Sequence, residues 1–171
     1  MKSNEEDESL IFLVGFMGAG KSSVGRALAE LIGFDFIDLD EIIESQAGKT
    51  ISAIFAEDGE NAFRQMEREA IKSCCGRKRT VIALGGGAFV SEENRAIVRR
   101  LGKSVWLDCP LEICLERTAG DEGRPLLKGE SEMKKLYESR LPFYSLADFV
   151  VTSVDESIEE TARRVAIVLG I

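Results

Sequence analysis

The stretch from residue 10 to residue 22, Leu10-Ile11-Phe12-Leu13-Val14-Gly15-Phe16-Met17-Gly18-Ala19-Gly20-Lys21-Ser22, runs from an apolar segment into a glycine-rich turn. Residues 15–22 fit the pattern Gly-x4-Gly-Lys-Ser/Thr; the apolar segment predicts a buried strand, and the amphipathic pattern over 23–32 predicts a helix. Glycines let backbone N–H groups surround phosphate oxygens, and the amino end of the helix adds further N–H groups. The turn therefore predicts a nucleoside triphosphate site, in which Lys21 meets the outer phosphates and the Ser22 hydroxyl ligates Mg²⁺.

Length and composition indicate one globular domain spanning residues 1–171, with 44% hydrophobic and 30% charged residues. The formal net charge of −8 argues against general nucleic-acid binding, which needs a basic face. Residues 1–8 are polar and acidic, so they predict a disordered tail rather than a signal peptide, and no apolar run reaches membrane-spanning length. These features predict that the chain binds neither nucleic acid nor membranes, and a cytoplasmic monomer is expected.

The chain has four cysteines and no histidine. The cysteines form no Cys-x-x-Cys pair, so reduced thiols are expected rather than a zinc site; they are Cys74, Cys75, Cys109 and Cys114. Without histidine, a general base must be a carboxylate, or the chemistry must need little base at all.

Short apolar runs alternate with helical patterns, which predicts an α/β fold with a parallel sheet and helices on both faces. The predicted strands are 11–14, 34–37, 81–84, 105–107 and 149–151. The predicted helices are 21–32, 40–46, 51–56, 61–73, 92–101, 111–119, 132–145 and 154–169. Ser91 and a capping box Ser153-x-x-Glu156 are expected to begin two of these helices, and Gly120 to end one.

Unusual residues follow the first three predicted strands. The glycine-rich turn follows the first strand, Asp38 and Asp40 follow the second, and Gly85-Gly86-Gly87 follow the third. Ligands of parallel α/β sheets bind beyond the carboxyl ends of the strands, so these features are expected to meet in one cleft. The polar, glycine-rich segment 120–130 between two predicted helices is typical of a mobile lid.

The acids and glycines also have purely structural interpretations. Asp38 and Asp40 can cap a helix and complement its dipole, and the three glycines can form a tight turn. In the neighbourhood of a phosphate-binding turn, one carboxylate can instead hold Mg²⁺ through water, and the other can orient an acceptor hydroxyl and accept its proton.

The arginines are equally ambiguous one at a time. Arg64 has glutamates at helical spacing and can form a surface ion pair. Arg124 and Arg140 can be solvated, and Arg117 can complement the dipole at the end of its helix.

Taken together, the motifs resemble the shikimate kinase family, of the nucleoside-monophosphate-kinase-like P-loop group. The motifs stand in family order over about residues 9–150 and are Gly-Phe-Met-Gly-Ala-Gly-Lys-Ser, Asp38-x-Asp40, Gly59-Glu60-x-x-Phe63-Arg64-x-x-Glu67, Gly85-Gly86-Gly87, Arg124-Pro-Leu-Leu and Arg140-x-Pro-x-Tyr144. The resemblance implies a three-layer P-loop kinase fold with a five-stranded parallel sheet in the order 2-3-1-4-5 and a mobile lid. It also implies ATP-dependent phosphorylation of the 3-hydroxyl of shikimate, giving shikimate 3-phosphate and ADP in aromatic amino acid biosynthesis.

For the nucleotide, the resemblance implies a cradle around the ATP phosphates formed by Gly18, Ala19, Gly20, Lys21, Ser22 and Ser23. Lys21 contacts the transferred group, Ser22 ligates Mg²⁺, and Asp38 holds the ion through water. Arg124 is brought in by lid closure to neutralise phosphate charge in the transition state, and Arg117 lies against adenine.

For the acceptor, the resemblance implies that Arg64 and Arg140 hold the shikimate carboxylate. The backbone of Gly85-Gly86-Gly87 approaches the substrate, with Gly86 at a ring hydroxyl. Asp40 orients the attacking 3-hydroxyl, so that the implied catalytic residues are Lys21, Asp40 and Arg124.

Three other functions compete with this prediction. A gluconate kinase of the same fold would also use arginines for a carboxylate. A GTPase-type switch needs Asp-x-x-Gly after a strand and Asn-Lys-x-Asp for guanine, and neither pattern occurs. A silent nucleotide-binding module would have lost Lys21, Asp40 or an arginine, and all of these are present.

Overall fold

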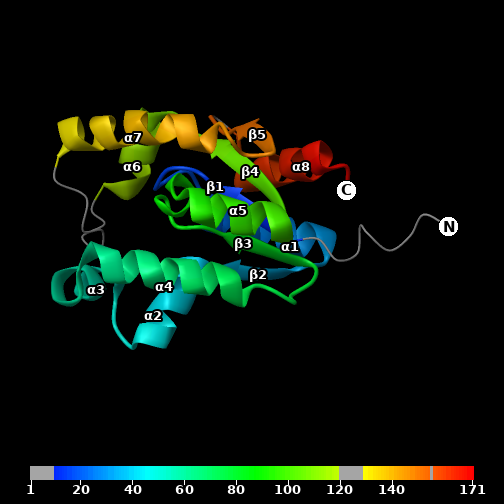
Figure 1. Ribbon diagram of the computed structural model, residues 1–171. Helices are drawn as coiled ribbons and strands as arrows, with labels where there is room; N and C mark the ends of the chain where they lie inside the picture. The colour runs from blue at the N-terminus through cyan, green and yellow to red at the C-terminus, as the bar shows by residue number, and fades with distance from the viewer. Residues whose placement is uncertain (1–9, 120–128, 155) are drawn as a thin grey trace.

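A five-stranded parallel sheet forms the centre of the molecule in the computed structural model, which describes residues 10–119, 129–154 and 156–171 (Figure 1). Its strands are β1 (Leu10–Val14), β2 (Asp35–Asp38), β3 (Thr80–Ala83), β4 (Gly102–Asp108) and β5 (Phe149–Thr152). The strand order is β2-β3-β1-β4-β5, which confirms the predicted order and the parallel sheet. Every residue of β1 and β3 is buried, as expected for central strands covered on both faces.

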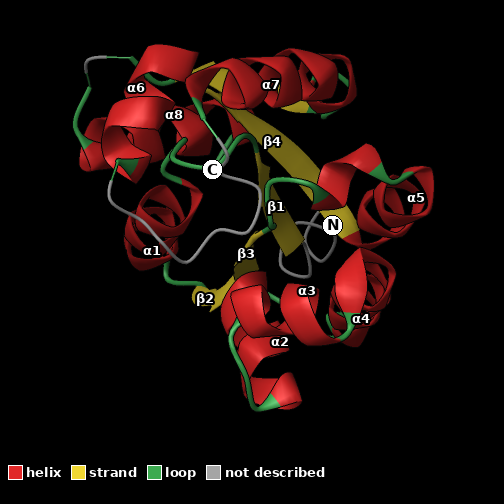
Figure 2. Ribbon diagram, turned by 90° about the vertical axis from the view of Figure 1, so that its left-hand side faces the viewer, coloured by secondary structure: helices red, strands yellow, loops and turns green. Residues whose placement is uncertain are grey.

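Helices cover both faces of the sheet. They are α1 (Lys21–Ile32), α2 (Leu39–Ala47), α3 (Ile51–Glu57), α4 (Gly59–Ser73), α5 (Glu92–Leu101), α6 (Leu111–Thr118), α7 (Glu130–Tyr144) and α8 (Ile158–Leu169), with a 3₁₀ turn η2 (Ala88–Val90) before α5. In Figure 2, α1 and α8 lie together on one side of the sheet and α5 lies on the other. Figure 1 shows α2, α3 and α4 grouped beside the β2 edge, where they pack on one another. The arrangement is the predicted three-layer fold.

The register of the sheet aligns the strand ends that carry the predicted site. Ala83 of β3 pairs with Leu13 of β1 on one side and with Asp38 of β2 on the other. The segments that follow β1, β2 and β3 therefore leave the sheet side by side, at the carboxyl ends of the strands. This alignment brings the phosphate-binding turn, the two aspartates and the three glycines into one region.

The structure corrects the predicted start of the last helix. Helix α8 begins at Ile158 rather than at 154, and its capping box is formed by Ser157 and Glu160 instead of Ser153 and Glu156. The Ser157 hydroxyl accepts a hydrogen bond from the Glu160 N–H at 3.2 Å, and the Ser157 N–H donates to the Glu160 carboxylate at 2.8 Å. Ser153 cannot begin the helix because its N–H donates to the Asp108 carbonyl at 2.8 Å, which continues the pairing of β5 with β4.

Other helix limits agree with the prediction to within two residues, and Ser91 caps α5 as expected, accepting from the Asn94 N–H. The predicted tail 1–8, Gly120 as a helix stop, Arg124 and nearly all of the predicted lid 120–130 lie outside the described residues. Within the described ranges, none of the helices combines the length and the apolar composition needed to cross a bilayer.

Candidate active site

One cavity of about 750 Å³ opens at the carboxyl ends of the strands. It is bordered by the turn after β1, the start of α2, the glycines after β3, and side chains from α4, α6 and α7. The predicted site residues that line it are Gly18, Gly20, Lys21, Ser22, Ser23, Asp38, Asp40, Arg64, Gly85, Gly86, Gly87, Arg117 and Arg140. Residues far apart in the sequence are thus brought together around one space.

The glycine-rich turn needs glycine at two positions for physical reasons. Gly20, the N-cap of α1, has φ 91°, and Gly18 has φ 79°, a region that side chains rarely adopt. A Cβ on Gly18 would also stand 2.6 Å from the Cys114 carbonyl oxygen of α6. The Lys21 Nζ donates to the carbonyl oxygens of Gly15 and Phe16, at 2.8 Å each, so the ammonium group is held against its own loop.

Asp38 connects the starts of two helices. Its Oδ2 accepts a hydrogen bond from the Ser22 hydroxyl at 2.5 Å, and its Oδ1 accepts from the Asp40 N–H at 3.0 Å. Asp38 is therefore the N-cap of α2, as its structural interpretation predicted, and it also lies beside the Ser22 hydroxyl. Hydroxyl and carboxylate oxygens are the hard donors that Mg²⁺ accepts alongside phosphate and water, so this pair fits the predicted ion.

Charged side chains lie against the backbone of the three glycines after β3. A Cβ on Gly85 would stand 3.0 Å from the Asp40 carboxylate and 3.1 Å from that of Glu67. A Cβ on Gly87 would lie 2.6 Å from two guanidinium nitrogens of Arg64. The absence of side chains in the glycine run therefore lets these charged groups approach the backbone closely.

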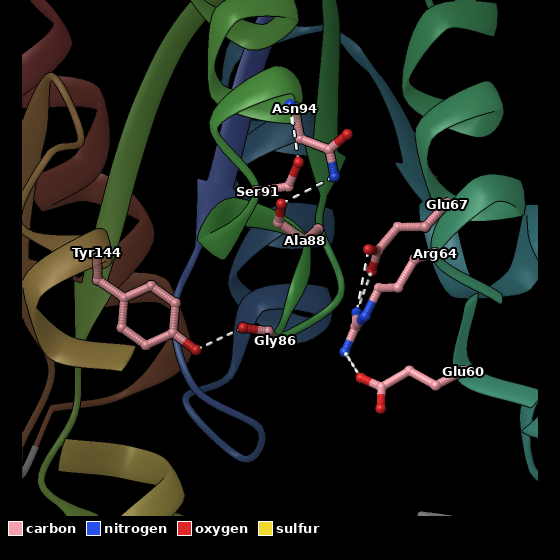
Figure 3. A network of polar contacts seen from close by, with 8 residues as sticks. All are labelled: Glu60, Arg64, Glu67, Gly86, Ala88, Ser91, Asn94 and Tyr144. Atoms are coloured by element: carbon pink, nitrogen blue, oxygen red, sulfur yellow. Dashed lines mark hydrogen bonds and ion pairs between the residues drawn. The ribbon is translucent and has the colours of Figure 1, made fainter. Parts of the chain in front are cut away.

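Arg64 of α4 is paired with a buried glutamate. Its Nη1 lies 3.2 and 3.1 Å from the two carboxylate oxygens of Glu67, and its Nη2 lies 3.4 Å from Glu60 (Figure 3). The Glu67 side chain is 1% exposed, whereas that of Glu60 is 58% exposed. Burial raises the pKa of Glu67 to about 7, although the Arg64 guanidinium opposes the shift. The ion pair proposed from helical spacing exists, but Glu67 is its buried member and holds Arg64 at the cavity.

Arg140 of α7 is a buried cation at the cavity wall. It is 5% exposed, and its Nη1 has no hydrogen-bond partner among the described residues. The guanidinium lies over the Phe16 ring at 5.7 Å and 3.2 Å from the position of a Cβ on Gly86. A buried donor without a partner is costly, so this guanidinium is suited to an anionic ligand in the cavity.

Arg117, near the end of α6, borders the glycine-rich turn. Its Nη1 donates to the Gly18 carbonyl at 3.3 Å and lies 3.6 Å from the position of a Cβ on Gly20. Ser153, just after β5, and Ile158, the first residue of α8, line the same cavity. The cavity lining therefore includes both a cation beside the glycine-rich turn and residues that follow β5.

Ala19 is not among the residues that line the cavity. Its side chain is 1% exposed, and its N–H donates to the Phe16 carbonyl at 3.1 Å within the turn.

Sequence reasoning missed Glu67 and Tyr144 as site residues, although both stand in the quoted motifs. Tyr144 donates its hydroxyl to the Gly86 carbonyl at 2.6 Å (Figure 3). The spacing of Glu67, three residues after Arg64, was the available signal in the sequence. Only its burial in the structure distinguishes Glu67 from an ordinary surface partner of Arg64.

Comparison with known proteins gives a consistent result. The family model described as shikimate kinase matches residues 17–169. A shikimate kinase of Persephonella marina is 45% identical over 148 residues, which cover 86% of this chain and 90% of that protein. A shikimate kinase of Paramagnetospirillum magneticum is 47% identical over 158 residues, covering 91% of this chain and 81% of that protein.

Among solved structures, the shikimate kinase of Acinetobacter baumannii in complex with shikimate superposes with a TM-score of 0.90. It is 38% identical in sequence, and the match covers 95% of this chain and 94% of that one. A family match over most of the chain, relatives above 30% identity and the P-loop fold agree with the motifs around the cavity. The chain belongs to the shikimate kinase family, and it is a kinase enzyme of that family.

Proposed function

We propose that this cavity carries out the ATP-dependent phosphorylation of shikimate, the family's activity in aromatic amino acid biosynthesis, by transfer of the γ-phosphoryl group to the 3-hydroxyl. The products are shikimate 3-phosphate and ADP. The observation that carries the proposal is one cavity bordered both by the glycine-rich turn and by the arginines Arg64 and Arg140. The first is suited to a triphosphate, and the second to a carboxylate.

The nucleotide half of the site is formed by the turn 18–23. Its N–H groups, that of Ser23 included, hold the ATP phosphates, while Lys21 contacts the transferred phosphoryl group. The Ala19 N–H is bonded to the Phe16 carbonyl, so Ala19 shapes the turn rather than binding phosphate. Ser22 and, through water, Asp38 would hold Mg²⁺, which would neutralise charge on the phosphates. Arg117 lies against the adenine ring, in line with its contact with the Gly18 carbonyl at the cavity.

The acceptor half of the site is formed by α2, α4, α7 and the glycines. Arg64 and Arg140 bind the carboxylate of shikimate, and the backbone of Gly85, Gly86 and Gly87 approaches the ring hydroxyls. Asp40 hydrogen-bonds the 3-hydroxyl, orients it toward the γ-phosphate and accepts its proton. The absence of a Cβ at Gly85 lets the Asp40 carboxylate approach this backbone.

Phosphoryl transfer passes through a loose transition state, so alignment and charge stabilisation matter more than a strong base. A chain without histidine meets this requirement with Lys21 and Asp40. Arg124, predicted from sequence to stabilise the transition state from the lid, lies outside the described residues and stays a prediction. The net charge of −8 supports the view that nucleic acid is not a partner; a cytoplasmic, membrane-independent monomer likewise stays a prediction from the sequence.

Titration of shikimate against wild type, Arg64→Ala and Arg140→Ala tests the proposal. Charge-assisted hydrogen bonds are worth roughly 1.5–3 kcal/mol each, so each variant should bind shikimate about 10- to 150-fold more weakly. ATP affinity measured without shikimate should hardly change, and Arg64→Lys should restore binding only in part, because an ammonium lacks the guanidinium fork.

Arg68→Ala is the matched control, since Arg68 stands one turn after Arg64 on α4 and pairs with Glu93 on the surface. It should leave shikimate affinity unchanged. Unaltered affinity in both cavity variants, or faster turnover of gluconate than of shikimate, would overturn the substrate assignment.

A further inference from the structure

The segment from Gly85 to Val90 has all of its carbonyl oxygens bonded to the protein itself. Within the segment, the Gly85 carbonyl accepts from the Ala88 N–H at 3.0 Å, and the Gly87 carbonyl accepts from the Val90 N–H at 3.2 Å. The side chains of α5 bind the carbonyls of η2. The Asn94 Nδ2 donates to Ala88 at 2.9 Å, and the Arg95 Nη1 donates to Phe89 and Val90 at 2.7 Å each.

The remaining carbonyl, that of Gly86, is held from the opposite direction. It accepts the Tyr144 hydroxyl at 2.6 Å, and Figure 3 shows the tyrosine reaching across from α7 to the glycine segment. The Tyr144 side chain is 1% exposed, and its ring lies 6.1 Å from the ring of Trp106. Because the buried Tyr144 ring has little freedom to move, its short hydrogen bond to the Gly86 carbonyl fixes the orientation of this peptide.

The hydrogen bonds to these carbonyls also determine the direction in which the N–H groups of the same peptides point. In a trans peptide, the C=O and N–H bonds point in opposite directions, and the described residues contain no cis peptide. The Gly85 and Gly86 carbonyls are bound by Ala88 and Tyr144, so the N–H groups of Gly86 and Gly87 point away from those donors. Gly86 and Gly87 line the cavity.

We infer that Tyr144 is a positioning residue for acceptor recognition: its hydroxyl fixes the Gly86–Gly87 peptide so that the Gly87 N–H faces a ring hydroxyl of the substrate. The inference rests on the proposed function, because it concerns the same acceptor. Tyr144 acts through Gly86, and its hydroxyl also interacts with the Arg140 guanidinium. Tyr144 stands one helical turn after Arg140, so α7 positions both the arginine that binds the substrate carboxylate and the tyrosine that orients the glycine peptide.

The test is Tyr144→Phe, which removes the hydroxyl and keeps the ring. Loss of one hydrogen bond that orients the peptide should weaken shikimate binding by about 3- to 10-fold. ATP affinity without shikimate should stay unchanged. Tyr137→Phe is the matched control: Tyr137 lies on the same helix, and its hydroxyl donates to the Cys109 carbonyl at 3.1 Å, so shikimate affinity should not move.

Analogues of shikimate that each lack one ring hydroxyl separate positioning from general loosening. For the analogue without the contacted hydroxyl, wild type and Tyr144→Phe should bind equally, while the penalty should persist for the others. A penalty that is the same for every analogue would overturn the inference, and so would wild-type shikimate affinity in Tyr144→Phe.

These outcomes differ from failure of the proposed function, which would appear as absent shikimate turnover in wild type and unaltered binding in Arg140→Ala. If Tyr144→Phe does not fold, the amide resonances of Gly86 and Gly87 in wild type carry the test. They should shift with shikimate and not with the analogue that lacks the contacted hydroxyl, and identical shifts with both would overturn the inference.

Discussion

Lys21 is held by two carbonyl oxygens of its own turn, so its side chain brings charge to the cavity without filling the core. We expect Lys21→Ala to fold normally, because glycine geometry and the packing of α1 shape the turn. Turnover should fall by about 100-fold or more, as for loss of a preorganised donor at a transition state. Coupled measurement of ADP release with shikimate checks this, with Lys49→Ala, whose lysine pairs with Glu57 on the surface, as the control. Near-normal phosphorylation by Lys21→Ala would contradict the assignment of the turn.

Glu67 makes the stability of the fold depend on pH. Its folded pKa of about 7 lies above the value of 4.5 in water, chiefly because burial disfavours the charged carboxylate. The folded chain therefore keeps a proton that the unfolded chain has released, and stability falls as pH rises from about 4.5 to 7. Glu67→Gln cannot titrate, so its free energy of unfolding should lose this slope and exceed that of wild type increasingly toward pH 7.

Urea unfolding at several pH values between 5 and 8 measures the effect. Glu60→Gln is the matched control, because Glu60 contacts the same Arg64 but is 58% exposed. It should retain the wild-type slope. Parallel pH profiles for wild type and Glu67→Gln would show that Glu67 ionises in the folded chain at its ordinary pKa.

For single residues, the sequence predicts which side chains bind the ligands better than it predicts which side chains contact one another. The turn pattern identified Lys21 and Ser22 as cavity residues because strand, turn and helix are contiguous in the chain. Glu67 was missed as a site residue because an i, i+3 pair looks the same on a surface and against buried backbone. Tyr144 was missed because its partner is a carbonyl 58 positions away.

Among the elements, β1 and β4 approach each other closely at Gly102. A Cβ on Gly102 would overlap the carbonyl oxygen of Leu10, which is backbone and cannot move aside cheaply. We expect Gly102→Ala to destabilise the fold by about 1–3 kcal/mol, the usual cost of overpacking. Because β1 leads into the phosphate-binding turn, ATP affinity should fall as well.

Thermal unfolding and ATP titration measure both effects. Gly48→Ala provides the comparison, since a Cβ there meets nothing within 4 Å and only its φ of 67° is strained. It should cost about 1 kcal/mol and leave ATP affinity unchanged. Equal losses of stability and of ATP affinity in the two variants would mean that the contact with Leu10 does not destabilise Gly102→Ala.

Strands and helices were largely predictable because the apolar runs are short, regular and separated by caps. The order of the strands came from the resemblance to a family, since local patterns do not specify which strands pair. The start of α8 was wrong because Ser153-x-x-Glu156 and Ser157-x-x-Glu160 both fit a capping box. The choice between them depends on the bond from Ser153 to Asp108 of β4, which no local pattern reports.

For the whole molecule, ligands that bind the one cavity should stabilise the entire fold. At about 100 times its dissociation constant, a ligand adds about 2.7 kcal/mol to the free energy of unfolding. A non-hydrolysable ATP analogue with Mg²⁺ and shikimate should each raise the melting temperature by roughly 5–10 °C, and Arg140→Ala should lose only the shikimate shift. Calorimetry checks this, and a shikimate shift that survives in Arg140→Ala would contradict the division of the cavity into two halves.

The single space that joins Lys21 to Arg140 also matters for inhibition. A compound that tethers a triphosphate mimic to a cyclic carboxylate could occupy both halves at once. Once one end is bound, the other end experiences an effective concentration in the millimolar range, so the combined avidity can exceed either affinity by about 10²- to 10⁴-fold. Many P-loop proteins bind triphosphates in a similar way, so a triphosphate mimic alone would not discriminate among them. The tethered carboxylate would make the compound selective for proteins that also carry the arginine pair.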